Sequence, residues 1–284
     1  MTATSTPSRA MRRLSMGLAT LFGLSRQGFF IPYRHAADRA RTQPAYAALE
    51  HHLRDAEADF LDLLAGIDDV ADSLMRIGQD PPPAPRWTQD WFPGLDAAAL
   101  YTVVRRLQPA RVVEVGAGHS TRFLAQAAAD GSLPVHITTI DPTPRAVLHG
   151  LEVDLVPATL ERAGMMPFAR LSAGDVLSID SSHVLMPGTD VDILLNRVLP
   201  DLPAGVLIHI HDIFLPDDYP ADWAWRGYNE QLAVAALIQG GRYRVLWSSH
   251  YVRTRLASAL RDTVMSRLPL PPGARESSLW LEKE

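Results

Sequence analysis

Apolar residues recur in steps of three and four along residues 46–77. They are Tyr46, Leu49, Leu53, Ala56, Phe60, Leu63, Ile67, Val70, Leu74 and Ile77. This spacing places them on one face of an α-helix. Gly66 and the pair Asp68-Asp69 are expected to split the segment into two helices. The apolar face covers either the chain's own main domain or a second copy of the chain in a homodimer.

The pattern changes after Asp96, where short apolar runs alternate with helical stretches. The apolar runs predict strands at residues 111–115, 135–140, 152–157, 175–180 and 205–210, and the stretches between them predict helices at residues 96–107, 119–129, 189–199 and 228–239. Strands that alternate with helices of this length form βαβ units, and therefore a parallel sheet covered on both faces. The sequence predicts an α/β fold of the Rossmann-like, doubly wound type, in which ligands bind at the carboxyl ends of the strands.

The run Pro81-Pro82-Pro83-Ala84-Pro85 cannot form a helix and predicts a stiff, extended spacer. We therefore expect an N-terminal helical region (residues 1–80), a proline-rich spacer (81–95) and a main domain (96–284). In the last part of the main domain, residues 242–252 and 278–281 predict strands that flank a helix at residues 255–268.

Composition restricts the function classes. The chain has 284 residues, of which 47% are hydrophobic and 21% charged, as in a globular protein. Its 27 basic and 32 acidic residues give a net charge of −5, which argues against nucleic acid as a partner. Because there is no cysteine, disulfides and thiolate nucleophiles are excluded, and a metal would need His, Asp, Glu or Asn ligands.

The first part of the chain is basic. Residues 1–43 contain seven arginines and one aspartate, whereas residues 44–80 contain two arginines and nine acids. Arg12 and Arg13 precede the apolar run 14–24, as in a secretory leader, but no small-x-small cleavage site follows. A basic amphipathic helix that packs on the protein or touches a membrane surface is favoured. No run approaches the ~18 apolar residues that cross a bilayer, so we expect a soluble, cytoplasmic protein.

A glycine-rich turn follows the first predicted strand of the main domain. The segment reads Glu114-Val115-Gly116-Ala117-Gly118-His119-Ser120-Thr121 and leads into a helix. The glycines allow a sharp turn and a close approach of a ligand to the helix N-terminus. Thr121 stands where a dinucleotide fingerprint has its third glycine, which disfavours a nicotinamide cofactor. Asp141 ends the second strand, where an acid can bind both hydroxyls of a ribose.

The order Glu114-x-Gly116-x-Gly118 and then Asp141-Pro142 resembles motifs I and II of the class I S-adenosylmethionine-dependent methyltransferases. Residues 179–183 (Ile-Asp-Ser-Ser-His) and 209–220 (His-Ile-His-Asp-Ile-Phe-Leu-Pro-Asp-Asp-Tyr-Pro) resemble a bacterial subgroup of that family. The resemblance covers roughly residues 87–283. It implies a mostly parallel seven-stranded sheet with a reversed last strand.

The same resemblance assigns cofactor contacts. It implies that Gly116, Ala117 and Gly118 surround the methionine part of S-adenosylmethionine, that Asp141 holds the ribose, and that Glu114 accepts from the amino group directly or through water. The expected cofactor site also includes His119, Ser120 and Thr159. Because Pro157-Ala158-Thr159 takes the place of the acidic or amide residue usual after the third strand, we expect backbone groups and apolar packing to hold the adenine.

Acids and histidines follow the fourth and fifth strands. Asp180 and His183 come after one strand, and His211 and Asp212 after the other, so all four open onto one crevice of such a sheet. One of them could take a proton from a hydroxyl or an amine. Asp180, His211 and Asp212 also resemble the acidic positions of metal-dependent O-methyltransferases, although histidine favours Zn²⁺, Fe²⁺ or Mn²⁺ and oxygen-only sites suit Mg²⁺. His209, between two isoleucines, is expected to be a core histidine.

The segment after the fifth strand, residues 214–225, is rich in aromatic residues and prolines and predicts a lid. Tyr219 and Trp223 would wall a substrate pocket, and Arg226 and Asn229 either face the substrate or cap the next helix. Trp87, Trp91 and Phe92 either cover the cofactor or anchor the spacer.

These features together predict transfer of a methyl group from S-adenosylmethionine to an oxygen or nitrogen atom of a small molecule. Two alternatives stay open. One keeps the fold and uses a metal at the Asp/His positions for hydrolytic or oxidative chemistry. The other is a partner-binding role for the helical segment 46–77.

Overall fold

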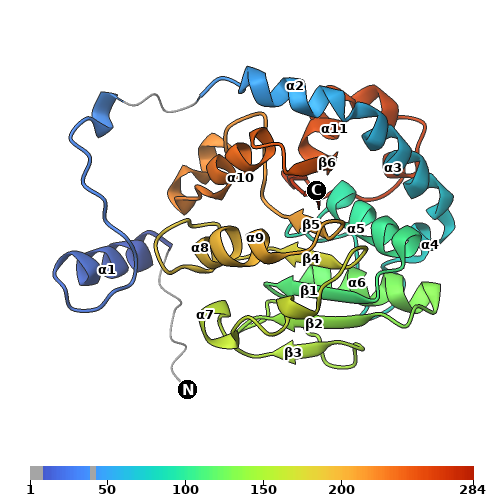
Figure 1. Cartoon of the computed structure of the whole chain (residues 1–284), viewed down its shortest axis with the longest axis horizontal. Helices are drawn as coiled ribbons and strands as arrows, with labels where there is room; N and C mark the ends of the chain where they lie inside the picture. Colours follow the sequence, from blue (N-terminus) through green and yellow to red (C-terminus); the bar gives the residue numbers. More distant parts are fainter. Residues whose placement is uncertain (1–8, 39–42) are drawn as a thin grey trace. The chain divides into compact units, whose positions relative to one another are not determined.

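The computed structural model describes residues 9–38 and 43–284. Residues 1–8 and 39–42, part of the basic stretch, lie outside the described residues. The chain divides into two compact units, Met1–Arg41 and Thr42–Glu284. The first contains helix α1 (Arg9–Leu21) and the 3₁₀ helix η1 (Ala36–Asp38), and the sheet lies entirely in the second (Figure 1). Within the described ranges, no helix has both the length and the apolar character needed to cross a membrane.

Seven strands form one sheet in the order β3-β2-β1-β4-β5-β7-β6. They are β1 (Arg111–Val115), β2 (His136–Ile140), β3 (Asp154–Val156), β4 (Val176–Ile179), β5 (Leu207–Ile210), β6 (Tyr243–Ser248) and β7 (Leu279–Lys283). The pairs among β1 to β5 are parallel, and β7 runs antiparallel to both neighbours. This confirms the predicted Rossmann-like fold with a reversed last strand. The strand order reverses between β1 and β4, which is the switch point where ligands bind in such sheets.

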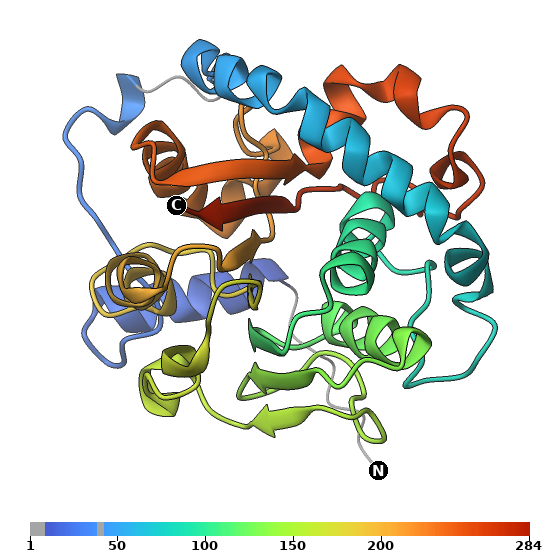
Figure 2. The ribbon, with the colours of Figure 1, turned by 45° about the vertical axis from the view of Figure 1, so that its right-hand side comes forward.

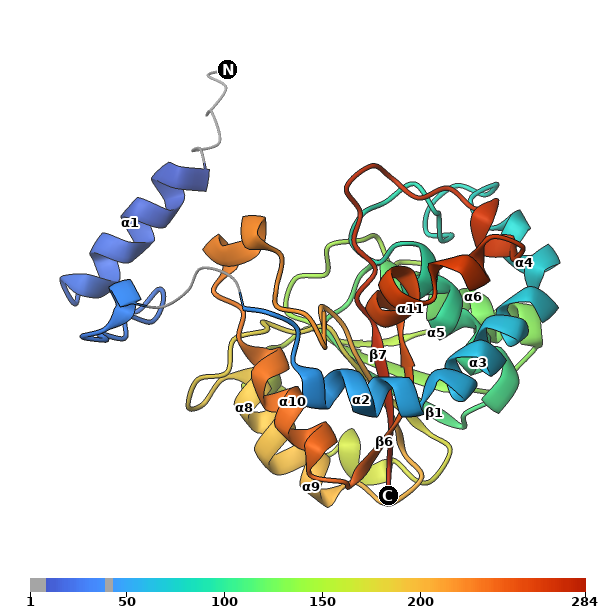
Figure 3. The same ribbon diagram turned by 90° about the horizontal axis from the view of Figure 1, so that it is seen from above.

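Helices cover the sheet on both sides. The helices α5 (Gly94–Leu107) and α6 (His119–Gly131) lie on one side, and α8 (Asp190–Ile193), α9 (Leu199–Asp201) and α10 (Glu230–Gln239) on the other (Figure 3). A π-helical turn, Leu194–Val198, joins α8 to α9, so the helix predicted at 189–199 is a composite. The short helix α7 (Leu160–Ala163) follows β3. Because both faces are covered, β4 and β5 are buried along their whole length, as apolar runs in a parallel sheet require.

The segment predicted from the helical spacing forms three helices. They are α2 (Ala47–Asp55), α3 (Glu57–Asp69) and α4 (Ala71–Arg76), with breaks at Ala56 and Val70. The break at Val70 follows the Asp68-Asp69 pair, as expected. Gly66 does not break α3; a Cβ there would lie 2.6 Å from Nη1 of Arg106, so the glycine instead lets that side chain pack closely.

The apolar face of these three helices covers the chain's own sheet domain. Leu53, Phe60, Ile67 and Leu74 are fully buried in the same core as the strands. Helix α3 packs against α5 and against the edge strand β6, and α2 packs against β6 and α10 (Figure 2). This burial explains why α5 is apolar along most of its length: it lies between the sheet and α3. A homodimer through residues 46–77 stays a prediction.

The proline-rich segment contains a turn and packs on the protein, whereas the sequence predicts an extended spacer. The backbone N–H of Ala84 donates to the carbonyl of Pro81. The side chains of Trp87 and Phe92 are buried, and the indole N–H of Trp87 donates to the carbonyl of Leu74. Residues 44–80, the proline-rich segment and the main domain therefore belong to one compact unit.

The last part of the chain also departs from the prediction. The strand expected at 242–252 ends at Ser248, whose hydroxyl accepts from the backbone N–H of Tyr251 and caps α11 (Ser249–Arg255). In place of a regular helix at 255–268 there are two 3₁₀ turns, η5 (Ala257–Leu260) and η6 (Val264–Ser266). The carboxylate of Asp68 accepts from the backbone N–H of Val264, which fixes the second turn against α3.

We expect Phe60→Ala to lower the free energy of unfolding by about 3–5 kcal/mol, because this ring is fully buried and makes edge-on contacts with Trp247 and Tyr251. Its neighbour Leu61 is 46% exposed, and Leu61→Ala should cost less than about 0.5 kcal/mol. Urea unfolding of both variants measures the difference. Equal stabilities would mean that α3 is not part of the core.

Candidate active site

The glycine turn after β1 makes a backbone-to-backbone contact with the end of β4. Gly116 has φ +88°, and a Cβ there would lie 1.8 Å from the carbonyl oxygen of Asp180. Gly118 is extended, and a Cβ there would meet no atom within 4 Å. Gly116 is therefore required by the packing of the protein itself. Gly118 instead leaves open space in front of the N-terminus of α6.

Glu114 lies beneath the turn and is fully buried. Its Oε1 accepts from the hydroxyl of Ser120 at 2.6 Å, and its Oε2 accepts from Thr121 at 2.6 Å and Thr139 at 2.8 Å. Burial raises the pKa of Glu114 to about 7, although these hydrogen bonds lower it. The carboxylate thus ties β1, β2 and the start of α6 together; its expected contact to a ligand amino group stays a prediction.

Asp141 links the end of β2 to the same turn. Its Oδ2 accepts from the backbone N–H of Ala117 at 2.8 Å, and its Oδ1 accepts from that of Thr143 at 2.6 Å. Each carboxylate oxygen has a further acceptor position after these bonds. The side chain is therefore fixed beside the glycine turn while it keeps the capacity to accept from ligand hydroxyls.

The first residue of α6 carries a buried polar atom without a partner. Nδ1 of His119 makes no hydrogen bond to any described residue. Burial, followed by the charges of Arg122 and Arg86, lowers the pKa of His119 to about 4, so the ring is neutral near pH 7. The hydroxyl of Ser120 is engaged by Glu114, and Thr159 precedes α7 without a capping side-chain bond. An unpartnered buried nitrogen beside open space suits a polar ligand.

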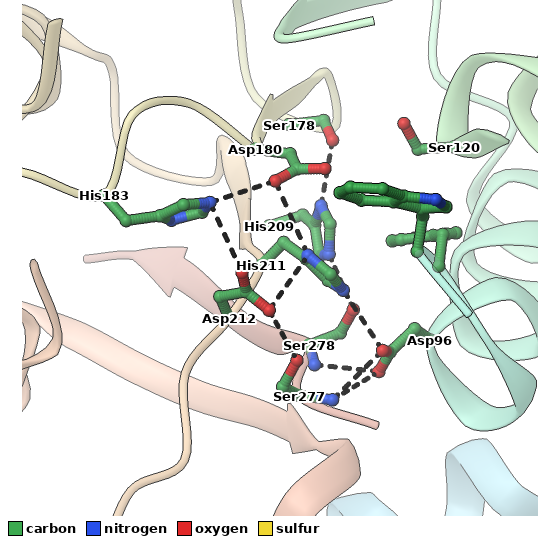
Figure 4. Close-up of polar contacts among 12 residues, drawn as sticks. Asp96, Ser120, Ser178, Asp180, His183, His209, His211, Asp212, Ser277 and Ser278 are labelled. Atoms are coloured by element: carbon green, nitrogen blue, oxygen red, sulfur yellow. Dashed lines mark hydrogen bonds and ion pairs between the residues drawn. The ribbon is translucent and has the colours of Figure 1, made fainter. Parts of the chain in front are cut away.

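Two histidines and four carboxylates form one cluster at the carboxyl ends of β4 and β5, and Figure 4 labels all of them except Glu230. We call it the histidine–carboxylate cluster: His183, His211, Asp96, Asp180, Asp212 and Glu230. Nε2 of His183 lies 3.2 Å from Asp180 and 3.5 Å from Asp212. Nδ1 of His211 lies 3.5 Å from the same two carboxylates. The structure thus brings together the four catalytic candidates that the sequence predicts.

Each imidazole also contacts a further carboxylate through its other ring nitrogen. Nδ1 of His183 lies 2.9 Å from Oε2 of Glu230, the first residue of α10. Nε2 of His211 lies 3.2 Å from Oδ2 of Asp96, on α5. Asp96 also accepts from the backbone N–H groups of Ser277 and Ser278. Asp96 is not among the predicted site residues, and an acid in the first turn of a helix gives no signal in the sequence beyond a local role.

The surroundings of the two histidines favour their charged form. Burial opposes protonation, but the hydrogen bonds with Asp180 and Glu230 raise the pKa of His183 well above its ordinary value. For His211, the charges of Asp212 and Asp180 likewise outweigh burial and raise the pKa. Burial disfavours the carboxylate of Asp180, yet the charge of His211 and the bond from His183 hold the pKa of Asp180 well below its usual range. The cluster is therefore a set of imidazolium–carboxylate pairs.

The metal site expected at Asp180, His211 and Asp212 does not fit this arrangement. Within residues 9–38 and 43–284, no group of three or more His, Asp or Glu side chains has the geometry to hold a metal ion. Every ring nitrogen of His183 and His211 lies 2.9–3.5 Å from a carboxylate oxygen. A metal ligand needs an unprotonated nitrogen that points at the ion, whereas these nitrogens are placed to donate to carboxylates.

Two residues of the cluster have unusual backbone angles. His183 has φ +58° and Asp212 has φ +57°, the left-handed region that residues other than glycine seldom adopt. The loop that holds His183 is fixed by Asn229, whose Oδ1 accepts from the N–H of Leu185 and whose Nδ2 donates to the carbonyl of the same residue. Such angles are retained where the surrounding contacts determine them, and they occur often at functional sites.

His209 has a different environment, as predicted. It is fully buried between the hydroxyls of Ser178 and Ser278, each 2.8 Å from a ring nitrogen. Burial, followed by the charge of His211, lowers the pKa of His209 to about 3. It is a neutral core histidine behind the cluster.

Aromatic residues of the expected lid surround Arg226. The guanidinium carbon lies 3.8 Å from the centre of the Trp223 ring and 5.3 Å from that of Tyr228, and Nη1 lies 3.8 Å from Asp212. Nε of Arg226 is buried without a partner among the described residues. Tyr219 accepts from the N–H of Gln231 through its hydroxyl. Trp223 and Arg226 therefore lie beside the cluster, while both polar atoms of the Asn229 side chain are engaged by the protein.

The aromatic residues before α5 differ in their positions. Phe92 is buried, with its ring centre 5.2 Å from that of His211. Trp91 is half exposed, and the guanidinium of Arg145 lies over its ring at 4.4 Å. Trp87 and Phe92 anchor the segment in the core, and only Trp91 is placed at a surface.

Residues 113–213 match a family model described as a methyltransferase domain. The matched segment runs from β1 to just beyond Asp212, and so contains the glycine turn, Asp141 and all of the histidine–carboxylate cluster except Asp96 and Glu230. No curated protein matches the chain.

Several solved structures are similar in fold at low identity. One is a methyltransferase from Podospora anserina with bound SAH, 17% identical, which covers 90% of this chain and 99% of its own at a TM-score of 0.43. Another is a putative O-methyltransferase from Klebsiella pneumoniae, 14% identical over 77% of this chain and 90% of its own, with a TM-score of 0.42. An O-methyltransferase from Bacillus cereus in complex with SAH is 11% identical over 78% and 91%, also at 0.42.

We expect Glu114→Gln to change how stability depends on pH. The pKa of Glu114 rises from 4.5 to about 7 on folding, so the folded protein holds this proton more tightly. Its contribution to stability is complete below about pH 4.5 and is lost as the pH rises to about 7, by roughly 3 kcal/mol. Glutamine cannot ionise and should remove that loss.

Urea unfolding of both proteins at about pH 5 and about pH 8 isolates this effect, because the other titrating groups cancel in the difference. If the free energy of unfolding changed by the same amount between these pH values in both proteins, Glu114 would be ionised in the folded state without loss of stability.

Proposed function

We propose that this chain is an S-adenosylmethionine-dependent methyltransferase that acts on an oxygen or nitrogen atom of a small molecule. The proposal rests on one observation: the glycine turn at the β1–β4 switch point lies in direct contact with Asp180, the residue that joins the turn to the histidine–carboxylate cluster. The match of residues 113–213 to a methyltransferase domain supports it.

The residues around the turn fit the cofactor. The open space beside Gly118, in front of the N-terminus of α6, suits the methionine part, and the remaining acceptor positions of Asp141 suit the two ribose hydroxyls. The unpartnered Nδ1 of His119 offers a further polar contact. When bound, S-adenosylmethionine supplies a methyl group on a positively charged sulfur, already activated for transfer.

The protein then has to orient the acceptor and receive its proton. Asp180 is the carboxylate of the cluster best placed for this, because 31% of its side chain is exposed whereas Asp96, Asp212 and Glu230 are at most 8% exposed. The acceptor O–H or N–H becomes more acidic as its atom forms the new bond, so a carboxylate of low pKa suffices. His183 and His211 hold Asp180 in position and compensate its charge before the proton arrives.

The aromatic residues and Arg226 suit the acceptor pocket. Trp223 and Tyr228 supply aromatic rings beside Arg226, whose buried Nε–H is a donor without a partner among the described residues. An acceptor with an aromatic or planar part and an oxygen atom would satisfy both. Burial of that Nε–H without a bond is costly, so a ligand oxygen there would gain affinity.

We expect Asp141→Ala to weaken the binding of S-adenosylhomocysteine at least tenfold. Hydrogen bonds to a charged group contribute about 1.5–3 kcal/mol each, and the substitution removes both carboxylate oxygens. Isothermal titration calorimetry measures the affinity. Asp262→Asn, on an exposed residue of the last segment, is the matched control and should bind as the unsubstituted protein does. Unchanged affinity of Asp141→Ala would contradict the cofactor site.

We expect Asp180→Asn to lower turnover by about 10²- to 10⁴-fold while S-adenosylhomocysteine still binds, because the substitution removes the proton acceptor and keeps the shape. Turnover is followed as transfer of labelled methyl from S-adenosylmethionine to a panel of phenols, catechols and amines.

The same assay is repeated after chelation and removal of metal ions. Because each imidazole nitrogen is paired with a carboxylate, activity should persist. Loss of activity on chelation, restored by one divalent metal, would instead support metal-dependent chemistry at these residues. Turnover by Asp180→Asn at the original rate would exclude Asp180 as the acceptor of the proton.

A further inference from the structure

Helix α1 in the first unit presents an apolar face that no described residue of that unit covers. Leu14, Leu18 and Leu21 follow one another at steps of four and three, so they lie on one side of the helix. Their side chains are 42–58% exposed. The segment after the helix adds further exposed apolar residues, which are 53–79% exposed: Phe22, Leu24, Phe29, Phe30 and Ile31.

The described part of this unit has no core of its own. None of residues 10–38 is buried, and η1 contains no buried residue. An isolated helix of 13 residues is only marginally stable in water. Stable folding of this helix therefore requires a partner that buries the leucine face.

The charges of the unit identify the chemistry of that partner. Helix α1 contains no acidic residue, and Arg12 and Arg13 lie outside the leucine face. Arg26 and Arg34 follow, also exposed, and Asp38 is the one acid of residues 9–38. A helix with leucines on one face, arginines on the other and aromatic residues nearby has the features of helices that lie in the interface of an anionic bilayer.

The acidic helices α2–α4 are less suitable partners. Their acids could attract the arginines, but most of their apolar residues are buried in the core of the second unit. The large apolar side chains that stay exposed on them are Leu61 on α3 and Met75 on α4, so they offer only a small apolar surface for the leucine face. A bilayer surface supplies both hydrocarbon and negative charge.

We propose that residues 9–34 bind the surface of membranes that contain anionic phospholipids. Helix α1 lies along the surface, with Leu14, Leu18 and Leu21 at the acyl boundary and the arginines at the phosphates. At 1.5 Å per residue its 13 residues extend for about 20 Å, less than the ~30 Å of the hydrocarbon core, so it lies in the interface rather than across it. This attachment is independent of the proposed methyl transfer.

The test is cosedimentation of the full chain with vesicles of phosphatidylcholine alone and of phosphatidylcholine mixed with phosphatidylglycerol. We expect binding to the mixed vesicles, weakened by added salt, and little binding to phosphatidylcholine. Leu18→Glu should weaken binding more than tenfold, because it places a charge at the acyl boundary. Arg12→Gln should weaken it about fivefold.

Two variants in the second unit serve as matched controls. Leu61→Glu replaces a leucine of similar exposure, 46% against 42% for Leu18, and Arg261→Gln replaces an exposed arginine. Both should bind vesicles as the unsubstituted protein does.

The proposal would be overturned if the chain did not sediment with the mixed vesicles, or if Leu18→Glu bound them as well as the unsubstituted protein does. It would also be overturned if Leu18→Glu lowered the midpoint of thermal unfolding without lipid, because Leu18 would then be buried within the chain. Binding of S-adenosylhomocysteine, measured in parallel, separates this result from the proposed catalytic function, since it should be the same in all the variants.

Discussion

The close contact between Gly116 and the backbone of Asp180 is the constraint on which the site depends. A side chain at position 116 would overlap the carbonyl of Asp180, so only glycine lets the turn after β1 reach the end of β4. Because the two strands are neighbours at the switch point, this contact sets the glycine turn directly beside the histidine–carboxylate cluster. Glu114 and Asp141 then hold the turn from below and from the side, through the hydroxyls of α6 and the N–H of Ala117.

The histidine–carboxylate cluster follows from a requirement of charge balance. Carboxylates at the ends of β4 and β5 are costly to bury unless positive charges accompany them. His183 and His211 provide those charges, because neighbouring carboxylates raise the pKa of both rings: Asp180 and Glu230 for His183, and Asp212 and Asp180 for His211. Glu230 and Asp96 contact the other ring nitrogens of His183 and His211. Substitution of either acid would therefore change the position and charge of a histidine that contacts Asp180. His183 and Asp212 both have left-handed backbone angles. We infer that the ion pairs of the cluster, rather than local backbone preference, hold the two residues in this conformation.

The apolar faces of α1 and of α2–α4 differ in burial. Helices α2–α4 bury theirs against α5 and the edge strand β6, which protects an edge that could otherwise pair with another chain. Helix α1 keeps its leucines exposed, and none of residues 10–38 around them is buried. The contrast in charge matches the contrast in burial: the acidic helices belong to a protein core, and the arginine-rich helix has the composition of a helix that binds an anionic surface.

The sequence by itself determined the parts that depend on local periodicity and on chain order. Alternating apolar runs specify the βαβ units, and residues that end parallel strands must meet at one edge of the sheet, so the glycine turn, Asp141, Asp180, His183, His211 and Asp212 could all be placed in advance. Only the tertiary structure decided which side chains pair. Asp96 lies 115 residues before His211, and nothing in its local sequence indicates that α5 brings it there. The same holds for the break at Ala56 and for the 3₁₀ turns after α11, because long-range packing and single contacts such as Asp68 with Val264 outweigh local helix preference.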